Sequence, residues 1–447
     1  MRPIAVELFA GAGGLSLGFE QAGFDVKAAV EIDPVHCAVH KFNFPHTAVL
    51  ARSVEGLSGD QIREAAGLGD AQIDCVSGGA PCQGFSLIGK RVLDDPRNRL
   101  AMDFLRIVTE LDARSFVFEN VKGLTVGKHK RFLEELVEAF DAAGYACRTP
   151  WKVLNAGHFG TPQSRERLIL MGVKRGLPLP DYPAPQTNIS GKPKAFDALP
   201  YGPNCKEALG DLPDAERFDA LVASDSTRGV RFGKPSEYAA ELRGLTNTAW
   251  HHGYMRDWQP SLLTSSARTD HTEITRRRFR DTVQGAVEPI SRFFKLATDG
   301  VSNTLRAGTD GARGAFTSPR PIHYKYNRCI TVREMARLHG FPDWFRFNGT
   351  KWHGARQIGN SVPPPLARAV AAQMMVALGY APQRPEGVLA LGDPNLLQFD
   401  LTRAAAHFNV EAMPSRRDRK SGATKRRQAD IEADLQQQSD AQKAANG

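Results

Sequence analysis

Short apolar runs alternate with amphipathic stretches between residues 4 and 172, and this alternation is the feature that most constrains the fold. The predicted strands cover 4–9, 26–31, 73–77, 115–119 and 168–173. The predicted helices between them include 14–22 and 132–143, which carry a helical period of apolar residues. Alternating strands and helices with short connections form a parallel sheet with helices on both faces. The sequence therefore predicts an α/β fold with a doubly wound, mostly parallel sheet.

The character of the chain changes near residue 176. From there to about residue 326 it is rich in Pro, Gly, Arg and Thr and has few periodic segments. Aromatic residues such as Trp250, Trp258 and Tyr324 are spread through this region, which favours a smaller, irregular inserted domain over disorder. Helical patterns return at 331–338 and 365–378. We therefore predict a first part of the α/β domain (1–175), an inserted domain (176–326), a closing part (327–385) and a C-terminal extension (386–447), which is a disordered basic and polar tail from about residue 412.

The composition narrows the class of protein. The chain has 447 residues, 41% of them hydrophobic, and a formal net charge of +9, which suggests a polyanionic partner. No apolar run approaches the ~18 residues of a membrane span, and no signal-peptide pattern is present. The six cysteines show no CxxC pairing and no nearby histidine partners. This argues against a metal site and a disulfide framework, and is typical of a reducing cytoplasm.

A single cysteine follows the predicted strand 73–77 in the segment SGGAPCQGFS. Glycine and proline stiffen this loop, and the end of a strand in an open α/β sheet is a common place for a nucleophile. Cys82 is thus a candidate nucleophile. The alternative is a small buried hydrophobic residue, because cysteine is among the most buried residue types.

A glycine-rich turn, LFAGAGGL at residues 8–15, joins the first predicted strand to the first helix, and Glu31 ends the second strand. A glycine turn lets a ligand approach the backbone, and an acid at the next strand end can hold both ribose hydroxyls. The pair indicates a nucleoside cofactor. The turn lacks the GxGxxG register of dinucleotide sites, and a plain tight turn is the alternative reading.

Three further blocks carry polar side chains at element boundaries. Glu119 ends the strand 115–119 in the segment FENV, where partial burial would raise the pKa of its carboxyl; a helix-capping role is the alternative. Gln163, Arg165 and Arg167 precede the strand 168–173 and, in strand register, share one face suited to a carbonyl oxygen, phosphate or carboxylate. An exposed charged edge is the alternative there. The segment RQIGNSVPPP at 356–365 begins the last helix.

Taken in order, these blocks resemble the DNA cytosine-5 methyltransferases of bacterial restriction–modification type. The resemblance covers roughly residues 3–175 and 326–380 and includes the segment RCITVREMARLHGFP at 328–342. It implies a Rossmann-like methyltransferase fold dependent on S-adenosyl-L-methionine, with the insert as target recognition domain. It also implies methyl transfer to C5 of cytosine within a specific sequence of double-stranded DNA, in restriction–modification or host DNA protection.

The resemblance assigns catalytic roles. Cys82 would attack C6 of a cytosine flipped out of the duplex, which makes C5 nucleophilic. Glu119 would hydrogen-bond N3 and the exocyclic amine, and Arg165, together with Arg167, would hold O2 and the adjacent phosphate. A free thiol is only a few per cent thiolate at neutral pH, so the site should lower the pKa of Cys82.

The resemblance also implies binding residues. The cofactor would contact Phe9, Gly11, Gly13, Gly14, Leu15, Glu31, Ile32, Pro81, Asn360 and Val362. DNA would contact Gln83, Ser86, Lys90, Arg91, Arg97, Gln163, Thr304, Leu305 and Arg306. S-adenosyl-L-homocysteine would be the product, and no metal would be needed. A monomer in the bacterial cytoplasm, associated with the nucleoid through DNA, is expected, with a cognate endonuclease as a further partner.

Some features depart from the family pattern or leave alternatives open. The acidic residue that usually contacts the adenine amine has no clear counterpart: Ser53 occupies its place, with Asp60 and Asp74 as distant candidates. A tRNA cytosine-5 methyltransferase is an alternative function, although the large basic insert favours DNA. A catalytically inactive DNA-binding relative is another, although Cys82, Glu119 and Arg165 are all present.

Overall fold

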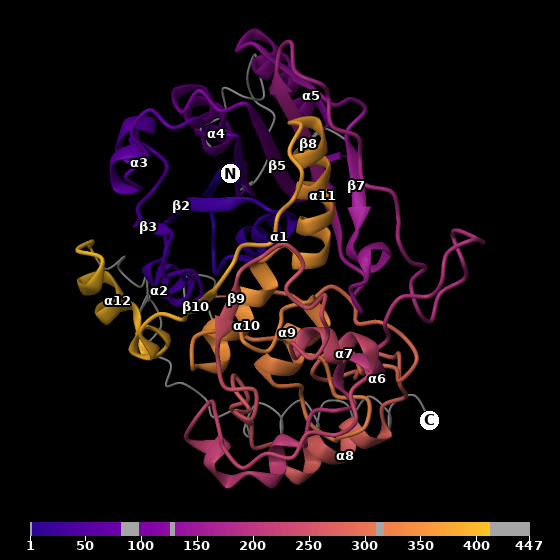
Figure 1. The fold of residues 1–447 in the computed structure, drawn as a ribbon. Helices are drawn as coiled ribbons and strands as arrows, with labels where there is room; N and C mark the ends of the chain where they lie inside the picture. Colours follow the sequence, from indigo (N-terminus) through magenta and orange to yellow (C-terminus); the bar gives the residue numbers. More distant parts are fainter. Residues whose placement is uncertain (1, 82–97, 126–129, 310–316, 412–447) are drawn as a thin grey trace, which may run out of the picture.

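The parallel sheet predicted from the sequence is present in the computed structural model, which describes residues 2–81, 98–125, 130–309 and 317–411. Its order is β3-β2-β1-β4-β5-β8-β6, and β7 also pairs with β8 (Figure 1). Five strands run parallel: β1 (Ile4–Leu8), β2 (Asp25–Glu31), β3 (Ala48–Ala51), β4 (Cys75–Gly78) and β5 (Ser115–Val121). β8 (Glu166–Lys174) is antiparallel to β5, β6 (Tyr145–Cys147) and β7 (Lys152–Asn155).

Helices cover both faces of the sheet, which confirms the doubly wound prediction. Successive strand residues point to opposite faces, so Val6 and Leu8 join one apolar core while Ala5 joins the other. The first core packs α3 (Gly59–Ala65), α4 (Arg99–Glu110) and α5 (Lys130–Ala142) on the sheet, with the Phe116 and Phe140 rings stacked 3.8 Å apart. Each such buried phenylalanine contributes about 1.5–3 kcal/mol of transfer free energy.

The opposite face is covered by α1 (Gly14–Ala22) and by α11 (Pro364–Ala377), which comes from the other side of the insert. These helices pack so closely that a Cβ on Gly18 would lie 2.3 Å from the Cβ of Ala367. The closing part of the chain therefore completes the α/β core, and Figure 1 shows α11 (orange) beside the indigo α1.

The core of the smaller part combines residues 205–305 with residues 330–358, and Leu17 and Phe44 of the α/β part join it. Its helices are α6 (Cys205–Leu209), α7 (Glu237–Leu242), α8 (Glu273–Asp281), α9 (Val332–His339) and α10 (Lys351–Asn360). The sequence specifies α9 sharply, because Thr331 and Glu334 form a reciprocal capping box and Gly340 ends the helix with φ 86°.

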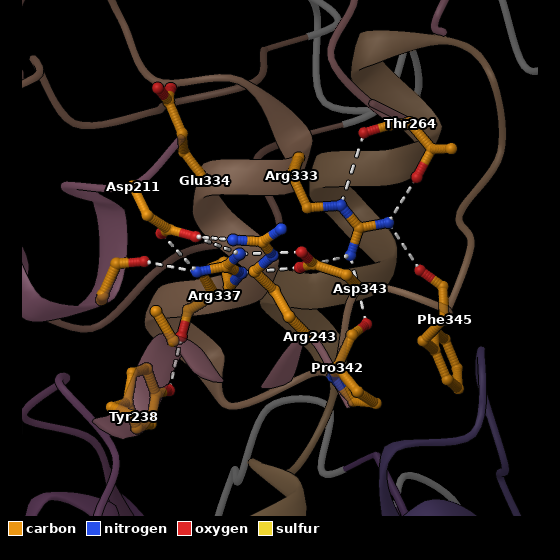
Figure 2. Close-up of polar contacts among 12 residues, drawn as sticks. Asp211, Tyr238, Arg243, Thr264, Arg333, Glu334, Arg337, Pro342, Asp343 and Phe345 are labelled. Carbon is orange, nitrogen blue, oxygen red and sulfur yellow. Dashed lines mark hydrogen bonds and ion pairs between the residues drawn. The ribbon is translucent and has the colours of Figure 1, made fainter. Parts of the chain in front are cut away.

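Buried charges fasten α9 to the insert (Figure 2). Arg337 pairs with Asp211 at 3.0 Å and with Asp343 at 2.6 Å, and all three side chains are buried. Arg333 donates to the Thr264 hydroxyl at 2.7 Å and to the Phe345 carbonyl at 2.8 Å. The cluster fixes α9 relative to the segments that follow α6 and precede α8.

Residues 386–411, the described part of the C-terminal extension, pack against both the insert and the α/β part. β10 (Val388–Ala390) pairs with β9 (Met255–Asp257) of the insert. Beyond it, the 3-10 helix Pro394–Gln398 and α12 (Leu401–His407) pack on α2 (Pro34–Asn43). The tail predicted from residue 412 lies outside the described residues. Among the residues described, no helix is long and apolar enough to span a membrane.

Candidate active site

The site forms where the chain order of the sheet reverses. β1 and β4 are neighbours in the sheet, with β2 and β3 on the side of β1 and β5 on the side of β4. The chain therefore leaves the carboxyl ends of β1 and β4 in opposite directions. The glycine turn follows β1 and the Cys82 loop follows β4, whereas Glu31 and Glu119 end or nearly end the flanking strands β2 and β5. Four of the predicted blocks therefore meet at one edge.

The glycine turn is shaped by close approach of its neighbours. Gly13 has φ 101°, and a Cβ there would lie 2.5 Å from the ring of Phe44. A Cβ on Gly14 would lie 2.5 Å from the carbonyl oxygen of Val362. Gly11 instead has open space around the position of a Cβ. The turn thus packs tightly at Gly13 and Gly14 and leaves open space beside Gly11.

Glu31 is held at this open side by backbone donors. Its Oε2 accepts from the amide of Gly11 at 2.8 Å, and its Oε1 accepts from the amide of Asp33 at 2.9 Å. The next residue, Ile32, is 47% exposed. An anchored carboxylate beside an accessible backbone and an exposed aliphatic side chain fits the sugar and base of a nucleoside.

A buried polar network supports the turn from below. Ser16 of α1 contacts the Glu7 carboxyl on one side and lies 3.0 Å from Nε2 of His40 on the other. Burial raises the pKa of Glu7 to about 8 and lowers the pKa of His40 to about 3. Both groups are therefore uncharged near neutral pH, as a dry environment requires.

Glu119 and Arg167 form the charged centre of the site. Arg167 Nε lies 2.7 Å from Glu119 Oε1, and both side chains are largely buried. Burial raises the pKa of Glu119, although the guanidinium groups of Arg167 and Arg165 oppose the shift. A Cβ on Gly79 would lie 2.5 Å from Oε2 of Glu119, so the backbone that follows β4 passes directly beside the carboxyl.

Asn120 is a site residue to which the sequence assigned no role. Its side-chain amide donates to the carbonyl of Ala80 at 2.9 Å and so ties β5 to the segment leading to Cys82. The sequence signal that points to Asn120 is an amide side chain at the carboxyl end of a central strand. Pro81 is exposed, whereas Cys82, Gln83, Ser86, Lys90, Arg91 and Arg97 lie outside the described residues.

The prediction that Gln163, Arg165 and Arg167 share a strand face is wrong. β8 begins at Glu166, and Gln163 and Arg165 lie in irregular chain before it, with side chains 0% and 1% exposed. Arg165 donates to the carbonyls of Leu305, Gly359 and Ser361. Of the three, Arg167 forms the ion pair with Glu119, whereas the side chain of Gln163 bonds to His339 of α9 and that of Arg165 bonds to carbonyls at the end of α10.

The other predicted contacts surround the centre. Thr304, Arg306 and Asn360 are exposed, whereas Leu305 and Val362 are buried. Leu15 is buried in the core beneath the glycine turn, and Phe9 is half-buried beside it. In this region the structure brings the segments 304–306 and 360–362 against each other, since a Cβ on Gly359 would lie 2.3 Å from the amide of Ala307.

Of the candidates for the adenine contact, Asp74 is excluded. It precedes β4 at the amino end of the sheet, where it binds the amide of Ile4 at 2.8 Å and Arg114 at 3.0 Å. Ser53 lies just beyond the carboxyl end of β3, and its hydroxyl accepts from the amide of Glu55 at 3.2 Å. Asp60 is exposed in the first turn of α3. Over the described part of the chain, no three His, Cys, Asp or Glu side chains are grouped to hold a metal ion.

Comparison with known proteins matches this arrangement to one family. The family model for C-5 cytosine-specific DNA methylase matches residues 4–376. The type II methyltransferase M.XorII of Xanthomonas oryzae pv. oryzae is 57% identical over 411 residues, which cover 92% of this chain and 93% of that protein. M1.HphI of Haemophilus parahaemolyticus, also a type II methyltransferase, is 32% identical over 373 residues, covering 82% and 85%.

Comparison with solved structures points to the same kind of protein. A structure described as a prophage-encoded DNA modification methyltransferase of E. coli has a TM-score of 0.66 and 32% identity, covering 84% of this chain and 99% of that one. The Dnmt2 methyltransferase of S. pombe, at 16% identity and a TM-score of 0.51 over 85% of this chain and 100% of that one, shares the fold.

Proposed function

This chain belongs to the C-5 cytosine-specific DNA methylase family, and from that premise we propose how its residues carry out the reaction. Enzymes of this family transfer the methyl group of S-adenosyl-L-methionine to C5 of cytosine in DNA. The observation that carries the residue assignment is the buried Glu119–Arg167 pair, which lies directly beneath the loop that leads to Cys82.

Cys82 is the proposed nucleophile. Its thiolate adds to C6 of a flipped-out cytosine, forming the S–C6 bond, and the electron pair of the C5=C6 bond moves to C5. C5 then takes the methyl group, and the electron pair of the broken sulfur–methyl bond stays with the donor sulfur. Loss of the C5 proton reforms the double bond and expels the Cys82 thiolate.

Glu119 is proposed to manage the charge that this addition pushes into the ring. Its carboxyl has a pKa raised by burial, so it holds a proton more readily than an exposed glutamate. Protonated, it donates to N3 of the base while its other oxygen accepts from the exocyclic amine. The hydrogen bond to N3 strengthens as negative charge develops there, which stabilises the transition state selectively.

Arg167 is proposed to contact the base directly, and Arg165 to act as its support. Arg167 lies against Glu119 and is partly accessible. The guanidinium of Arg165 already donates to three backbone carbonyls, and only its Nε is without a partner. A side chain so bound holds the segments 304–306 and 359–362 together more readily than it reaches a phosphate.

The methyl donor is proposed to lie over the glycine turn. Glu31 would hold the ribose hydroxyls and Ile32 would cover the adenine. The remaining contacts would come from Phe9, Gly11, Gly13, Gly14, Leu15, Pro81, Asn360 and Val362. S-adenosyl-L-homocysteine would leave as the product, and the proposed chemistry uses no metal ion.

Duplex DNA is the proposed macromolecular substrate. Thr304 and Arg306 are exposed beside the site, and exposed Arg277 and Arg280 on α8 add positive charge to the insert. These cations all lie on the insert and favour contact with the phosphates of a duplex bound beside the site. We further propose that the chain acts as a monomer in the bacterial cytoplasm, alongside a cognate endonuclease.

The test is incubation of the purified chain with tritiated S-adenosyl-L-methionine and unmethylated genomic DNA. Nucleoside analysis and bisulfite sequencing should place the label in 5-methylcytosine at one short repeated sequence. Cys82→Ala should abolish transfer while DNA binding persists. Label in tRNA instead of DNA would overturn the substrate assignment, and turnover by Cys82→Ala would overturn the nucleophile assignment.

A further inference from the structure

A buried histidine of α9 stands between the two segments that surround the site. His339 is 0% exposed, and it is not among the residues to which a chemical role is assigned above. Its Nδ1 lies 2.9 Å from Nε2 of Gln163, and its Nε2 lies 3.1 Å from the carbonyl oxygen of Ser361. Gln163 in turn accepts from the amide of Leu305 at 3.0 Å. A continuous chain of hydrogen bonds therefore joins Leu305 to Ser361.

The direction of each bond is fixed by chemistry. A carbonyl oxygen only accepts, so His339 donates to Ser361 from Nε2 and carries its lone pair on Nδ1. Gln163 donates to that lone pair through Nε2, and its Oε1 is left to accept from Leu305. A second proton on His339 would sit on Nδ1 and face the amide hydrogens of Gln163. Burial, together with the nearby charge of Arg165, also lowers the pKa of His339 well below its ordinary value. The imidazole thus acts in a single neutral tautomer.

Arg165 forms a parallel bridge between the same two segments. It donates to the carbonyl of Leu305 at 2.9 Å, to Gly359 at 2.7 Å and to Ser361 at 2.9 Å. Both backbone groups of Leu305 and both lone pairs of the Ser361 oxygen are occupied by the two bridges. Gln163, Arg165, Leu305, His339 and Ser361 form a closed ring of side chains and backbone, which we refer to as the buried ring.

The ends of the buried ring lie at the two proposed binding surfaces. Leu305 is flanked by exposed Thr304 and Arg306, which are two of the proposed DNA contacts. Ser361 is flanked by Asn360 and Val362, and a Cβ on Gly14 in the cofactor turn would lie 2.9 Å from Cβ of Ser361. A displacement of either segment is therefore passed on to the other through rigid, fully bonded groups rather than through loose packing.

We infer that His339 is a positioning residue whose buried ring makes the DNA-contacting segment and the cofactor wall move as one unit, so that each ligand strengthens the binding of the other. This inference rests on the proposed function, because it takes the two surfaces to bind DNA and cofactor. By reciprocity, cofactor must raise DNA affinity by the same factor as DNA raises cofactor affinity.

The experiment measures the dissociation constant of S-adenosyl-L-homocysteine with and without a duplex that carries the sequence found by bisulfite mapping. In the wild type, we expect the duplex to tighten binding at least about fivefold. His339→Phe keeps a planar ring but removes both polar atoms, and should bring this factor close to one. His339→Gln supplies a donor and an acceptor again and should restore much of the factor.

Tyr238→Phe is the matched control. It removes one hydrogen bond, which the Tyr238 hydroxyl donates to the carbonyl of Arg337 in α9 at 2.6 Å (Figure 2). The buried ring, which also includes a residue of α9, stays intact. Its coupling factor should equal that of the wild type, which separates coupling from loss of stability. If His339→Phe does not fold, His339→Leu, which also removes both polar atoms, takes its place in the comparison with Tyr238→Phe.

Two results would overturn the inference: no coupling in the wild type, or unchanged coupling in a folded His339→Phe protein. Neither result bears on the proposed function, which stands or falls with methyl transfer by the wild type. Conversely, absence of methyl transfer with intact mutual enhancement of binding would contradict the catalytic roles and leave the buried ring as described.

Discussion

Gly79, in the loop after β4, lies so close to the Glu119 carboxyl that an added methyl group would not fit between them. A Cβ there would lie 2.5 Å from Oε2 of Glu119, closer than real contacts allow, so Gly79→Ala must displace the carboxyl or the loop. A misplacement of about 1 Å at a reacting centre costs on the order of a hundredfold in rate. We expect kcat for methyl transfer to fall by about that factor, measured with tritiated donor at saturating DNA.

Gly123→Ala is the control for that substitution. Gly123 lies in the short helical turn after β5, and a Cβ there would meet nothing within 4 Å. Its kcat should stay within about twofold of the wild type. Equal rates for Gly79→Ala and the wild type would show that the carboxyl does not lie where its role requires.

Glu7 gives the protein a specific dependence of stability on pH. Burial raises its pKa from 4.5 to about 8, so the folded state binds a proton that the unfolded state releases in this interval. The stability it contributes is full below about pH 4.5 and is lost as pH rises through about 8. Urea unfolding should show the free energy of unfolding of the wild type falling relative to Glu7→Gln, by on the order of a few kcal/mol between pH 5 and pH 9.

All other titrating groups are present in both proteins, so their contributions to the pH dependence cancel in the difference between the wild type and Glu7→Gln. A difference that does not change with pH would mean that Glu7 is ionised in the folded state. The Ser16 contact would then be a charged hydrogen bond, and the network beneath the glycine turn would carry a charge.

The helix α9 depends on its buried ion pairs to hold the insert. Arg337→Met removes the charge that pairs with both Asp211 and Asp343. It leaves only the longer ion pairs of Arg243 with Asp211 at 3.3 Å and of Arg333 with Asp343 at 3.7 Å. Removing one partner of a buried ion pair costs about 3–5 kcal/mol. Equilibrium urea unfolding should show that loss.

A surface ion pair provides the contrast. Lys130 and Glu134 lie 3.4 Å apart on α5 with both side chains well exposed, so Glu134→Gln should cost less than about 1 kcal/mol. If Arg337→Met costs no more than Glu134→Gln, the cluster of Figure 2 does not fasten α9, and the apolar core alone does.

The elements predicted from sequence are those whose own residues decide their structure. The helix at 14–22 and the strands β1, β2 and β5 have apolar periods that need no partner, and the structure confirms them within a few residues. Helix α2 is missing from the predicted elements, although Asp33 and Pro34 form a strong helix start: Asp33 accepts from the amide of Val35 at 2.9 Å.

The orientation of some site residues depends on parts of the chain that are distant in sequence, and it could not be predicted from local pattern. Gln163 and Arg165 look like a strand edge locally, but their partners Leu305, Gly359 and Ser361 lie far along the chain. The same reason hides His339, whose ring bridges two segments that no local pattern connects. By contrast, Glu31 and Glu119 follow from the rule that parallel strands end at a shared edge.

The whole molecule carries an excess of positive charge that should govern its affinity for DNA of any sequence. With a formal net charge of +9 and cations exposed on α8, binding to non-cognate duplex should release many counterions. From about 50 to about 200 mM salt, the affinity should fall on the order of a thousandfold, measured by fluorescence anisotropy.

Binding of S-adenosyl-L-homocysteine in the absence of DNA provides the internal control for that measurement. The proposed cofactor site uses one carboxylate and backbone groups, so its affinity should change little over the same range. A flat salt dependence for DNA would mean that few phosphates are contacted and that the excess charge serves another purpose.

The position of α11 also sets the order of events when the protein is made. α1 leaves the ribosome near the start of translation, yet the surface against which Gly18 packs is made only after the whole insert. Until residues 364–377 emerge, the sheet face that carries α1 lacks α11, even though the segments that contain Cys82 and Glu119 have already been synthesised. We therefore expect no methyl transfer by the nascent chain, and methylation should begin only with nearly full-length molecules.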